Sequence, residues 1–199
     1  MVETSRINEG VKMKDIFSVP ENLAEPQDDG ACDHLLGFKI PELNLMSTDT
    51  KCINVGQISD IVVYYFYPMI GDPAELPGDD WNSIPGARGC TPQSCSYRDK
   101  YSSFSKSKVR VFGVSGQQHE KQCAAKERLH LPFELLSDIN FNLCDSLMLP
   151  KFVYNGELYV KRVTLIVVNG IIEMVFYPVF PSDSDSDLVL KWLGQSVGS

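Results

Sequence analysis

The chain has 199 residues and lacks any apolar run long enough to cross a membrane. Apolar stretches such as Ile61 to Tyr67 fall far short of the roughly 20 residues that a spanning helix needs. The N-terminal residues also lack the run of about 7–15 apolar residues that marks a secretory signal. The sequence therefore predicts no membrane partner and a cytoplasmic, reducing location.

Positive charge is also in short supply, with 18 Lys and Arg against 26 Asp and Glu and a formal net charge of -8. Such a surface repels a phosphate backbone, so nucleic acid is not expected as a partner. The sequence shows no glycine-rich phosphate loop after a predicted strand and no nucleophile elbow around a serine. These absences argue against nucleotide-binding enzymes and against serine hydrolases.

Cysteine is too sparse for a disulfide scaffold, with six in 199 residues beside a full complement of hydrophobic residues. Two pairs, Cys32 with His34 and His119 with Cys123, each offer two metal ligands. Neither has a second pair at the spacing of a zinc site. We therefore expect no metal and no other cofactor.

The composition that remains is that of a folded protein, with 43% hydrophobic and 22% charged residues. The length suits one globular domain, alone or with an arm. Residues 1–36 are polar and include Pro20 and Pro26, so they are predicted to form an irregular N-terminal arm. Residues 37–199 are predicted to form the domain.

From Gly37 onward the chain alternates between strand-like and helix-like segments, and this order predicts an α/β protein. Asn169-Gly170 marks a type I′ turn in a hairpin near the C-terminus. The order favours a thioredoxin-like fold, a mixed central sheet with helices on both faces and an N-terminal hairpin. The predicted strands cover 40–45, 50–55, 61–67, 109–114, 133–136, 163–168 and 171–176, and the predicted helices begin near 90, 118, 141 and 188.

Two further expectations concern polar and thiol side chains. The Ser/Asp run from 182 to 187 is expected to supply N-cap residues and negative charge to the last helix. Cys52, Cys123 and Cys144 fall on predicted strands or helices, and they are expected to be buried, unreactive thiols.

A long Pro/Gly-rich stretch separates Pro68 from Gly89, and it is not expected to sustain a helix or a central strand. Loops of this length inside a compact domain are uncommon and often functional. This loop ends at Cys90, where the next helix is predicted to begin. Pro92 suits the first turn of that helix, and Tyr97, Tyr101 and Phe104 follow at helical spacing.

A cysteine at a helix N-terminus is chemically unusual. Backbone N–H groups without partners and the positive end of the helix dipole favour a thiolate over a thiol there. A thiolate attacks a peroxide oxygen and becomes a sulfenic acid. Cys90 is therefore the candidate nucleophile, although a free cysteine taken alone is often just a small buried side chain.

Cys95 follows five residues later and is a candidate to condense with that sulfenic acid. An unbroken helix holds two such Cα atoms about 8.7 Å apart. A disulfide tolerates at most about 7 Å, so residues 89–97 are expected to unwind before the bond can close. Cys144 and Cys32 remain alternative partners.

The full string resembles the Q-type, or bacterioferritin-comigratory-protein, peroxiredoxins. The segments that carry the resemblance, in order, are Tyr65-Phe66-Tyr67-Pro68, Gly89-Cys90-Thr91, Cys95 to Asp99, Val111 to Ser115, Leu135 to Asp138 and Arg162, and it covers residues 37–195. It implies a thiol peroxidase with Cys90 as peroxidatic and Cys95 as resolving cysteine. It also implies that Arg162 contacts the peroxidatic sulfur, with Arg98 and Arg88 as competing candidates.

The same resemblance implies the partners. Hydrogen peroxide or a small organic hydroperoxide is the expected substrate, and a thioredoxin- or glutaredoxin-like dithiol is the expected reductant. No metal, haem or flavin is implied, and a monomer is expected.

This sequence departs from the family pattern at two places. Ala87 stands where the family presents a threonine that hydrogen-bonds the peroxide, and the loop before Cys90 is longer than usual. The alternatives for the missing hydroxyl are Ser83, Thr91 or backbone N–H groups. Because of these two departures, an alternative function is a redox sensor or binding module with little peroxidase turnover. A thiol–disulfide oxidoreductase is disfavoured because it needs a C-x-x-C pair.

Overall fold

The computed structural model describes residues 17, 23–75 and 77–196. Its centre is a mixed sheet with the strand order β2-β1-β5-β4-β3-β8-β9. β3, β4 and β5 run parallel. β8 is antiparallel to β3, and β9 is antiparallel to β8. The strands are β1 (Asn44–Ser47), β2 (Cys52–Asn54), β3 (Ile61–Phe66), β4 (Arg110–Ser115), β5 (Glu134–Ser137), β8 (Val163–Val168) and β9 (Ile171–Phe176).

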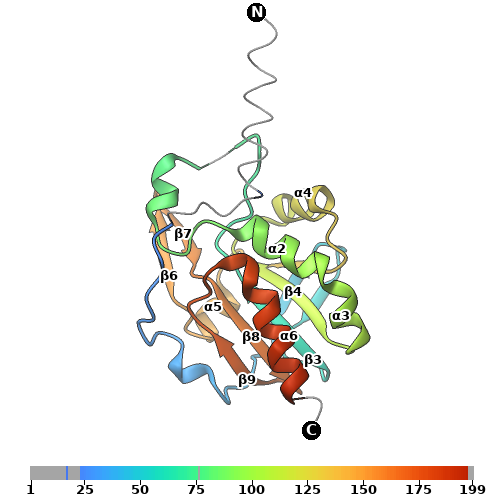
Figure 1. Cartoon of the computed structure of the whole chain (residues 1–199). Helices are drawn as coiled ribbons and strands as arrows, with labels where there is room; N and C mark the ends of the chain where they lie inside the picture. Colours follow the sequence, from blue (N-terminus) through green and yellow to red (C-terminus); the bar gives the residue numbers. More distant parts are fainter. Residues whose placement is uncertain (1–16, 18–22, 76, 197–199) are drawn as a thin grey trace, which may run out of the picture.

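Helices cover both faces of this sheet, as the sequence predicts. α2 (Cys90–Asp99), α3 (Tyr101–Lys106), α4 (His119–Leu129) and α6 (Asp185–Ser196) contribute to the core on one face, and α5 (Asn142–Ser146) contributes to the core on the other. Figure 1 shows α2, α3 and α6 in front of the sheet and α5 behind it. The thioredoxin-like fold is therefore confirmed.

The buried strand β3 shows how the sequence builds this double-sided core. Successive side chains of a strand point to opposite faces. Tyr64 and Phe66 accordingly pack in one cluster, while Tyr65 and Tyr67 pack in the cluster beneath α2 and α6. Since both faces are covered, the strand has to be apolar throughout.

The β8–β9 hairpin matches its predicted bounds. Asn169 and Gly170 have φ of 50° and 80°, the left-handed conformations that a type I′ turn requires. The N-terminal hairpin of β1 and β2 is also present, and it is shorter than predicted because only Asn44 to Met46 pair with Cys52 to Asn54.

A second hairpin was not predicted. β6 (Lys151–Tyr154) and β7 (Glu157–Val160) form a separate two-stranded sheet. Its turn is Asn155-Gly156, with φ of 50° and 80°, the same turn signal that marks the β8–β9 hairpin. The sequence therefore carries the same local signal for this hairpin as for the β8–β9 hairpin.

Two helix expectations also change. The helix that begins at Cys90 ends at Asp99, and a separate short helix starts at Tyr101, so Phe104 does not continue the same helix. The long loop before Cys90 contains a 3-10 turn, η2 (Asp79–Ser83), which the Pro/Gly content did not suggest.

The predicted N-terminal arm lies partly outside the described residues. Within the part that is described, a 3-10 turn, η1 (Asp33–Leu35), follows irregular chain, and Cys32 and Leu35 are buried in the core. This end of the arm therefore packs on the domain.

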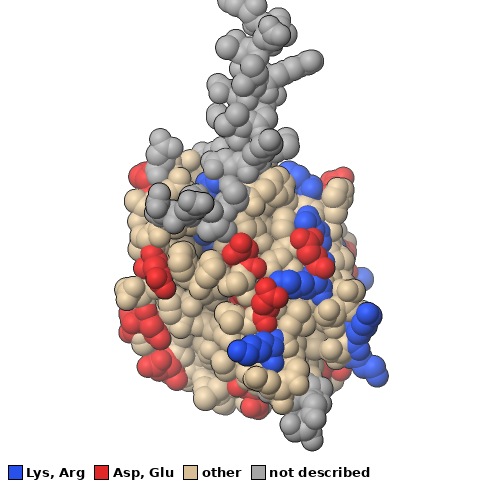
Figure 2. Space-filling view, in the orientation of Figure 1, with Lys and Arg blue, Asp and Glu red and all other residues tan. Residues whose placement is uncertain are grey.

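On the surface drawn in Figure 2, the lower left edge carries acidic side chains, whereas acidic and basic side chains lie together in the centre and on the right. Within the described part of the chain, no helix combines the length and the apolar composition needed to cross a membrane.

Candidate active site

Cys90 is the first residue of α2, where the sequence places it. The preceding Gly89 has φ of 107°, a left-handed conformation that favours glycine. A Cβ at Gly89 would lie 2.1 Å from Oγ of Ser182, in the 3-10 turn η3 (Ser182–Ser184) that precedes α6. Gly89 therefore allows both the turn into α2 and the close approach of the C-terminal segment.

Arg162 lies against the Cys90 sulfur. Its Nη2 is 3.3 Å from Sγ of Cys90, and the same nitrogen donates to the backbone carbonyls of Gly86 (3.3 Å) and Arg88 (3.2 Å). The Arg162 side chain is buried. A guanidinium held this close stabilises negative charge that forms on sulfur.

The sheet register explains why Arg162 reaches this point. Val163 begins β8 and pairs with Phe66, the last residue of β3. Arg162 therefore lies at the edge where the parallel strands end, which is where α/β folds commonly place their sites.

A buried hydrogen-bond network continues behind Arg162. Oε1 of Gln93 accepts from Nη1 of Arg162, and Nε2 of Gln93 donates to Oδ2 of Asp185 at 2.7 Å. Tyr97 and Thr164 each donate a hydroxyl to the same carboxylate oxygen at 2.8 Å. The network joins α2, β8 and the start of α6.

Asp185 is fully buried in this network. Burial raises the pKa of its carboxyl, while the hydrogen bonds from Gln93, Thr164 and Tyr97 act to lower it. The Ser/Asp run was expected to supply N-cap residues and negative charge to the last helix, and Asp185 and Asp187 do lie in the first turn of α6. The burial of Asp185 was not expected. Ser182 and Ser186 are buried as well.

Sequence reasoning missed both Gln93 and Asp185. Gln93 lies three residues after Cys90, so helical spacing alone puts the two on neighbouring positions of one face. That signal was available for Gln93. No local pattern separates Asp185 from the exposed aspartates beside it, because only the packing of α6 on α2 buries it.

A small pocket opens beside Cys90, with about 30 Å³ open to the centre of a water molecule. One wall is the start of α2 and the residues before it, including Ala87 and Thr91. The other lining residues come from the long segment after β3 and are Met69, Gly71, Pro77 and Trp81.

The pocket also bears on the missing threonine. Ala87 is buried in the wall, and its carbonyl oxygen lies 3.7 Å from the Cys90 sulfur. Thr91 lines the pocket, whereas Ser83 does not and instead donates its hydroxyl to the carbonyl of Asp80 at 2.6 Å. Of the two hydroxyl alternatives, the structure therefore brings only Thr91 to the site.

Cys95 lies on the same helix and is half-buried, and neither it nor Cys90 forms a disulfide here. Burial raises the pKa of the Cys95 thiol, and the positive charge of Arg98 opposes that rise. Since α2 is continuous from Cys90 to Asp99, the unwinding expected for a 90–95 bond stays a prediction.

The two competing arginines have different surroundings. Arg98 donates to the carbonyl of Leu129 (2.9 Å) and to Asp99 (2.8 Å), away from the Cys90 sulfur. Arg88 lines the Cys90 pocket, and Nη1 of its guanidinium lies 3.4 Å from Oδ1 of Asn82.

The other thiols are only partly as expected. Cys144 is buried, and burial raises the pKa of its thiol, which fits an unreactive side chain. Cys52 is exposed and Cys123 is half-buried, so the expectation of burial is wrong for these two. Cys32 is buried despite its place in the polar arm, and burial raises the pKa of its thiol to about 12.

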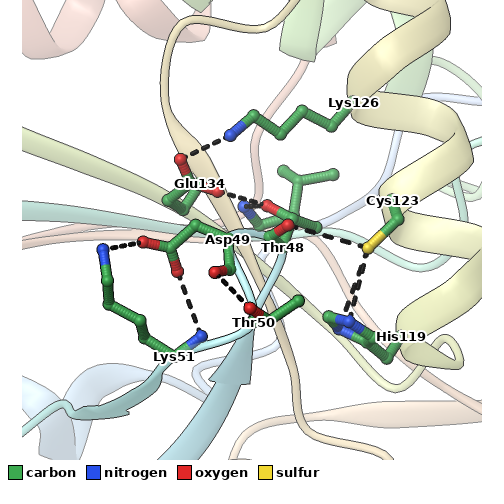
Figure 3. A network of polar contacts seen from close by, with 9 residues as sticks. Thr48, Asp49, Thr50, Lys51, His119, Cys123, Lys126 and Glu134 are labelled. Atoms are coloured by element: carbon green, nitrogen blue, oxygen red, sulfur yellow. Dashed lines mark hydrogen bonds and ion pairs between the residues drawn. The ribbon is translucent and has the colours of Figure 1, made fainter.

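Cys123 and His119 face each other on α4, as Figure 3 shows, with Sγ of Cys123 3.4 Å from Nε2 of His119. The nearby carboxylate of Glu134 binds Lys126 and the hydroxyl of Thr48 instead. Among the residues that the structure describes, no three His, Cys, Asp or Glu side chains are grouped as metal ligands would be.

This chain is similar to a known protein family and to several known proteins. The model of the AhpC/TSA family matches residues 82–175, which include Cys90, Cys95 and Arg162. The chain is 29% identical over 158 residues to the chloroplastic peroxiredoxin Q of Suaeda salsa, covering 79% of this chain and 66% of that protein. It is 31% identical over 132 residues to the chloroplastic peroxiredoxin Q of Sedum lineare, covering 66% of this chain and 62% of that protein. The alignments thus span about two thirds of these relatives.

Solved structures support the fold. The peroxidoxin BcpB of Mycobacterium tuberculosis superposes with a TM-score of 0.66 at 24% identity, covering 81% of this chain and 97% of that one. Peroxiredoxin Q of Xanthomonas campestris superposes with a TM-score of 0.62 at 20% identity, covering 87% and 98%. Both likenesses concern the thioredoxin-like architecture around the candidate site.

Proposed function

We propose that this chain is a thiol peroxidase whose peroxidatic residue is Cys90, since the AhpC/TSA family model matches residues 82–175 around Cys90 and similar curated proteins are peroxiredoxins Q. The observation that carries the proposal is the buried guanidinium of Arg162, 3.3 Å from the Cys90 sulfur at the start of α2. A thiol held only for packing has no need of a buried cation, whose desolvation is costly.

In the proposed first step, the Cys90 thiolate attacks one oxygen of hydrogen peroxide or of a small organic hydroperoxide. The S–O bond forms as the O–O bond breaks, and the electron pair leaves with the other oxygen, which takes up a proton to become water or an alcohol. Arg162 stabilises the negative charge on sulfur before attack and on the oxygens during it. Thr91 is the proposed hydroxyl in place of the family threonine.

In the proposed second step, the Cys95 thiolate attacks the sulfur of the Cys90 sulfenic acid. The S–S bond forms and hydroxide departs, becoming water with the proton lost by Cys95. α2 unwinds around residues 89–97 for this step. A thioredoxin- or glutaredoxin-like dithiol then reduces the disulfide, the protein acts as a monomer in a reducing compartment, and no cofactor takes part.

Peroxide consumption by the reduced protein tests the first step. Cys90→Ser should abolish consumption, whereas Cys52→Ser, at an exposed thiol away from the site, should leave it unchanged. Full activity in Cys90→Ser would reject the assignment.

Non-reducing peptide mass spectrometry after one equivalent of peroxide tests the second step. The expected product is a 90–95 disulfide that is absent from Cys95→Ser. A bond from Cys90 to Cys32 or Cys144 would assign another resolving thiol.

A second candidate function rests on Ala87, which lacks the hydroxyl that the family offers the peroxide. In this alternative the protein is a redox sensor or binding module that oxidises once and turns over little. Multiple turnover with a thioredoxin system would exclude it, and a stable oxidised form that such a system fails to reduce would favour it.

A further inference from the structure

The segment that lengthens the connection between β3 and α2 forms one side of the Cys90 pocket. Met69, Gly71, Pro77 and Trp81 all come from this segment, and they line the pocket together with the start of α2. The family resemblance has no counterpart for this length of chain. The chain therefore uses its extra residues to narrow the approach to the candidate nucleophile.

The space that this wall leaves is small. About 30 Å³ is open to the centre of a water molecule, and a single water needs at least about 10–15 Å³ on that scale. Hydrogen peroxide is no longer than a pair of water molecules, so it matches this space. A hydroperoxide with a branched alkyl group would bring that group against the wall.

Trp81 is the largest side chain that lines the pocket, and aromatic side chains of the β6–β7 hairpin pack against its ring. Only 2% of Trp81 is exposed. Its ring lies against Phe152, Tyr154 and Tyr159 of the β6–β7 hairpin, with centroid distances of 5.7, 5.0 and 5.1 Å. Figure 1 shows the green η2 turn that carries Trp81 beside β6 and β7.

The backbone around Trp81 is held as well. Its N–H donates to the carbonyl of Gly78, and its carbonyl accepts from the N–H of Ile84, which closes the η2 turn. The hydroxyl of Tyr154 donates to Oδ1 of Asp80 at 2.7 Å, tying the same turn to the hairpin. Moving the indole outward therefore requires separating η2 from the hairpin.

We infer that Trp81 and the η2 turn form a size filter at the Cys90 pocket, which admits hydrogen peroxide and excludes hydroperoxides with bulky organic groups. This inference rests on the proposed peroxidase function and narrows its substrate class. Trp81 is a specificity-determining residue in this assignment. The β6–β7 hairpin supports it from behind.

The test compares second-order rate constants for oxidation of Cys90 by hydrogen peroxide and by tert-butyl hydroperoxide, in the full-length reduced protein. The natural protein should prefer hydrogen peroxide. Trp81→Ala should raise the relative rate with tert-butyl hydroperoxide by about 10-fold or more, because a single pocket contact changes discrimination on this scale. Trp81→Phe, which keeps a ring in the wall, should shift it less.

Trp192→Ala is the matched control, since it removes the other tryptophan, which lies on α6 outside the pocket lining. Its peroxide preference should equal that of the natural protein. Equal rates with the two peroxides in the natural protein would overturn the inference. So would equal changes of both rates in Trp81→Ala.

A labelling experiment tests the size selectivity of the Cys90 pocket without using peroxide. Cys90 alkylation is measured by peptide mass spectrometry with iodoacetamide and with a bulky maleimide, relative to the exposed Cys52 in the same molecule. The Cys90-to-Cys52 ratio should fall with the larger reagent, and the fall should shrink in Trp81→Phe or Trp81→Ala. An equal fall in the variants would overturn the inference. If no peroxide reacts with the natural protein while the labelling result holds, the proposed function fails and the filter stands.

Discussion

Gln93 links Arg162 to Asp185, with its carbonyl oxygen accepting from the guanidinium and its amide donating to the carboxylate. One neutral side chain thereby joins a buried cation to a buried acid. The arrangement leaves Nη2 of Arg162 for the Cys90 sulfur and for two backbone carbonyls. The orientation of the guanidinium is therefore set from both ends.

Replacing Arg162 should slow the oxidation of Cys90. Arg162→Met keeps much of the side-chain volume and removes the charge, and the rate constant with hydrogen peroxide should fall by about 100-fold or more, as for loss of a donor to developing negative charge. Stopped-flow measurement of Cys90 oxidation gives this rate. Arg110→Met, at an exposed position at the start of β4, should change it little, and an unchanged rate in Arg162→Met would remove Arg162 from the site.

The buried carboxyl of Asp185 should make the free energy of unfolding decrease as the pH rises. Burial raises the pKa of its carboxyl above 3.8, so the folded protein holds this proton more tightly than the unfolded chain does. The stability that this group contributes is fully present below the unfolded pKa and is lost as the pH rises through the folded pKa.

Asp185→Asn cannot lose a proton and should lack that decline. Urea unfolding across a pH series is the measurement, with the free energy of unfolding compared between the two proteins at each pH. Asp183→Asn, at an exposed position in the same Ser/Asp run, should follow the natural protein. Parallel pH profiles for Asp185→Asn and the natural protein would contradict the assigned direction.

Gly89→Ala should lower the free energy of unfolding more than an alanine substitution at another glycine with positive φ. Gly156 also has positive φ and has open space where a Cβ would stand, so Gly156→Ala should cost about 1–2 kcal/mol of unfolding free energy from backbone strain alone. Gly89→Ala adds a clash with Ser182 and should cost more, while also slowing Cys90 oxidation.

Chemical denaturation and the peroxide rate measure the two effects. The double variant Gly89→Ala with Ser182→Gly should recover part of the loss, because it removes the clashing hydroxyl. Equal costs at Gly89 and Gly156 would show that the contact with Ser182 carries no energetic weight.

Oxidation should loosen the start of α2. If Cys90 bonds Cys95, backbone amides in residues 89–97 should exchange with deuterium faster in the oxidised than in the reduced protein, since the helix has to unwind. α4 serves as the internal reference and should keep its protection. Equal exchange of residues 89–97 in the two forms would rule out the 90–95 bond.

Local patterns in the sequence determined much of this protein. The apolar run from Ile61 predicted a strand covered on both faces, and Asn169-Gly170 specified the turn of the β8–β9 hairpin. The end of the Pro/Gly-rich loop and the position of Pro92 in a first turn placed the start of α2 at Cys90. These features follow from side-chain periodicity and backbone preference, which act over a few residues. Asn155-Gly156 carries the same turn signal for the β6–β7 hairpin.

Only the tertiary structure decided which residues of the Ser/Asp run and of the long loop take part in the site. Asp185 and Asp183 belong to one repetitive run, and packing of α6 against α2 buries the first while leaving the second exposed. Trp81 lies in a segment whose Pro/Gly content predicts only a loop, and contact with a distant hairpin turns it into a pocket wall. Burial and long-range contact are properties of the folded chain as a whole, so no spacing along the sequence encodes them.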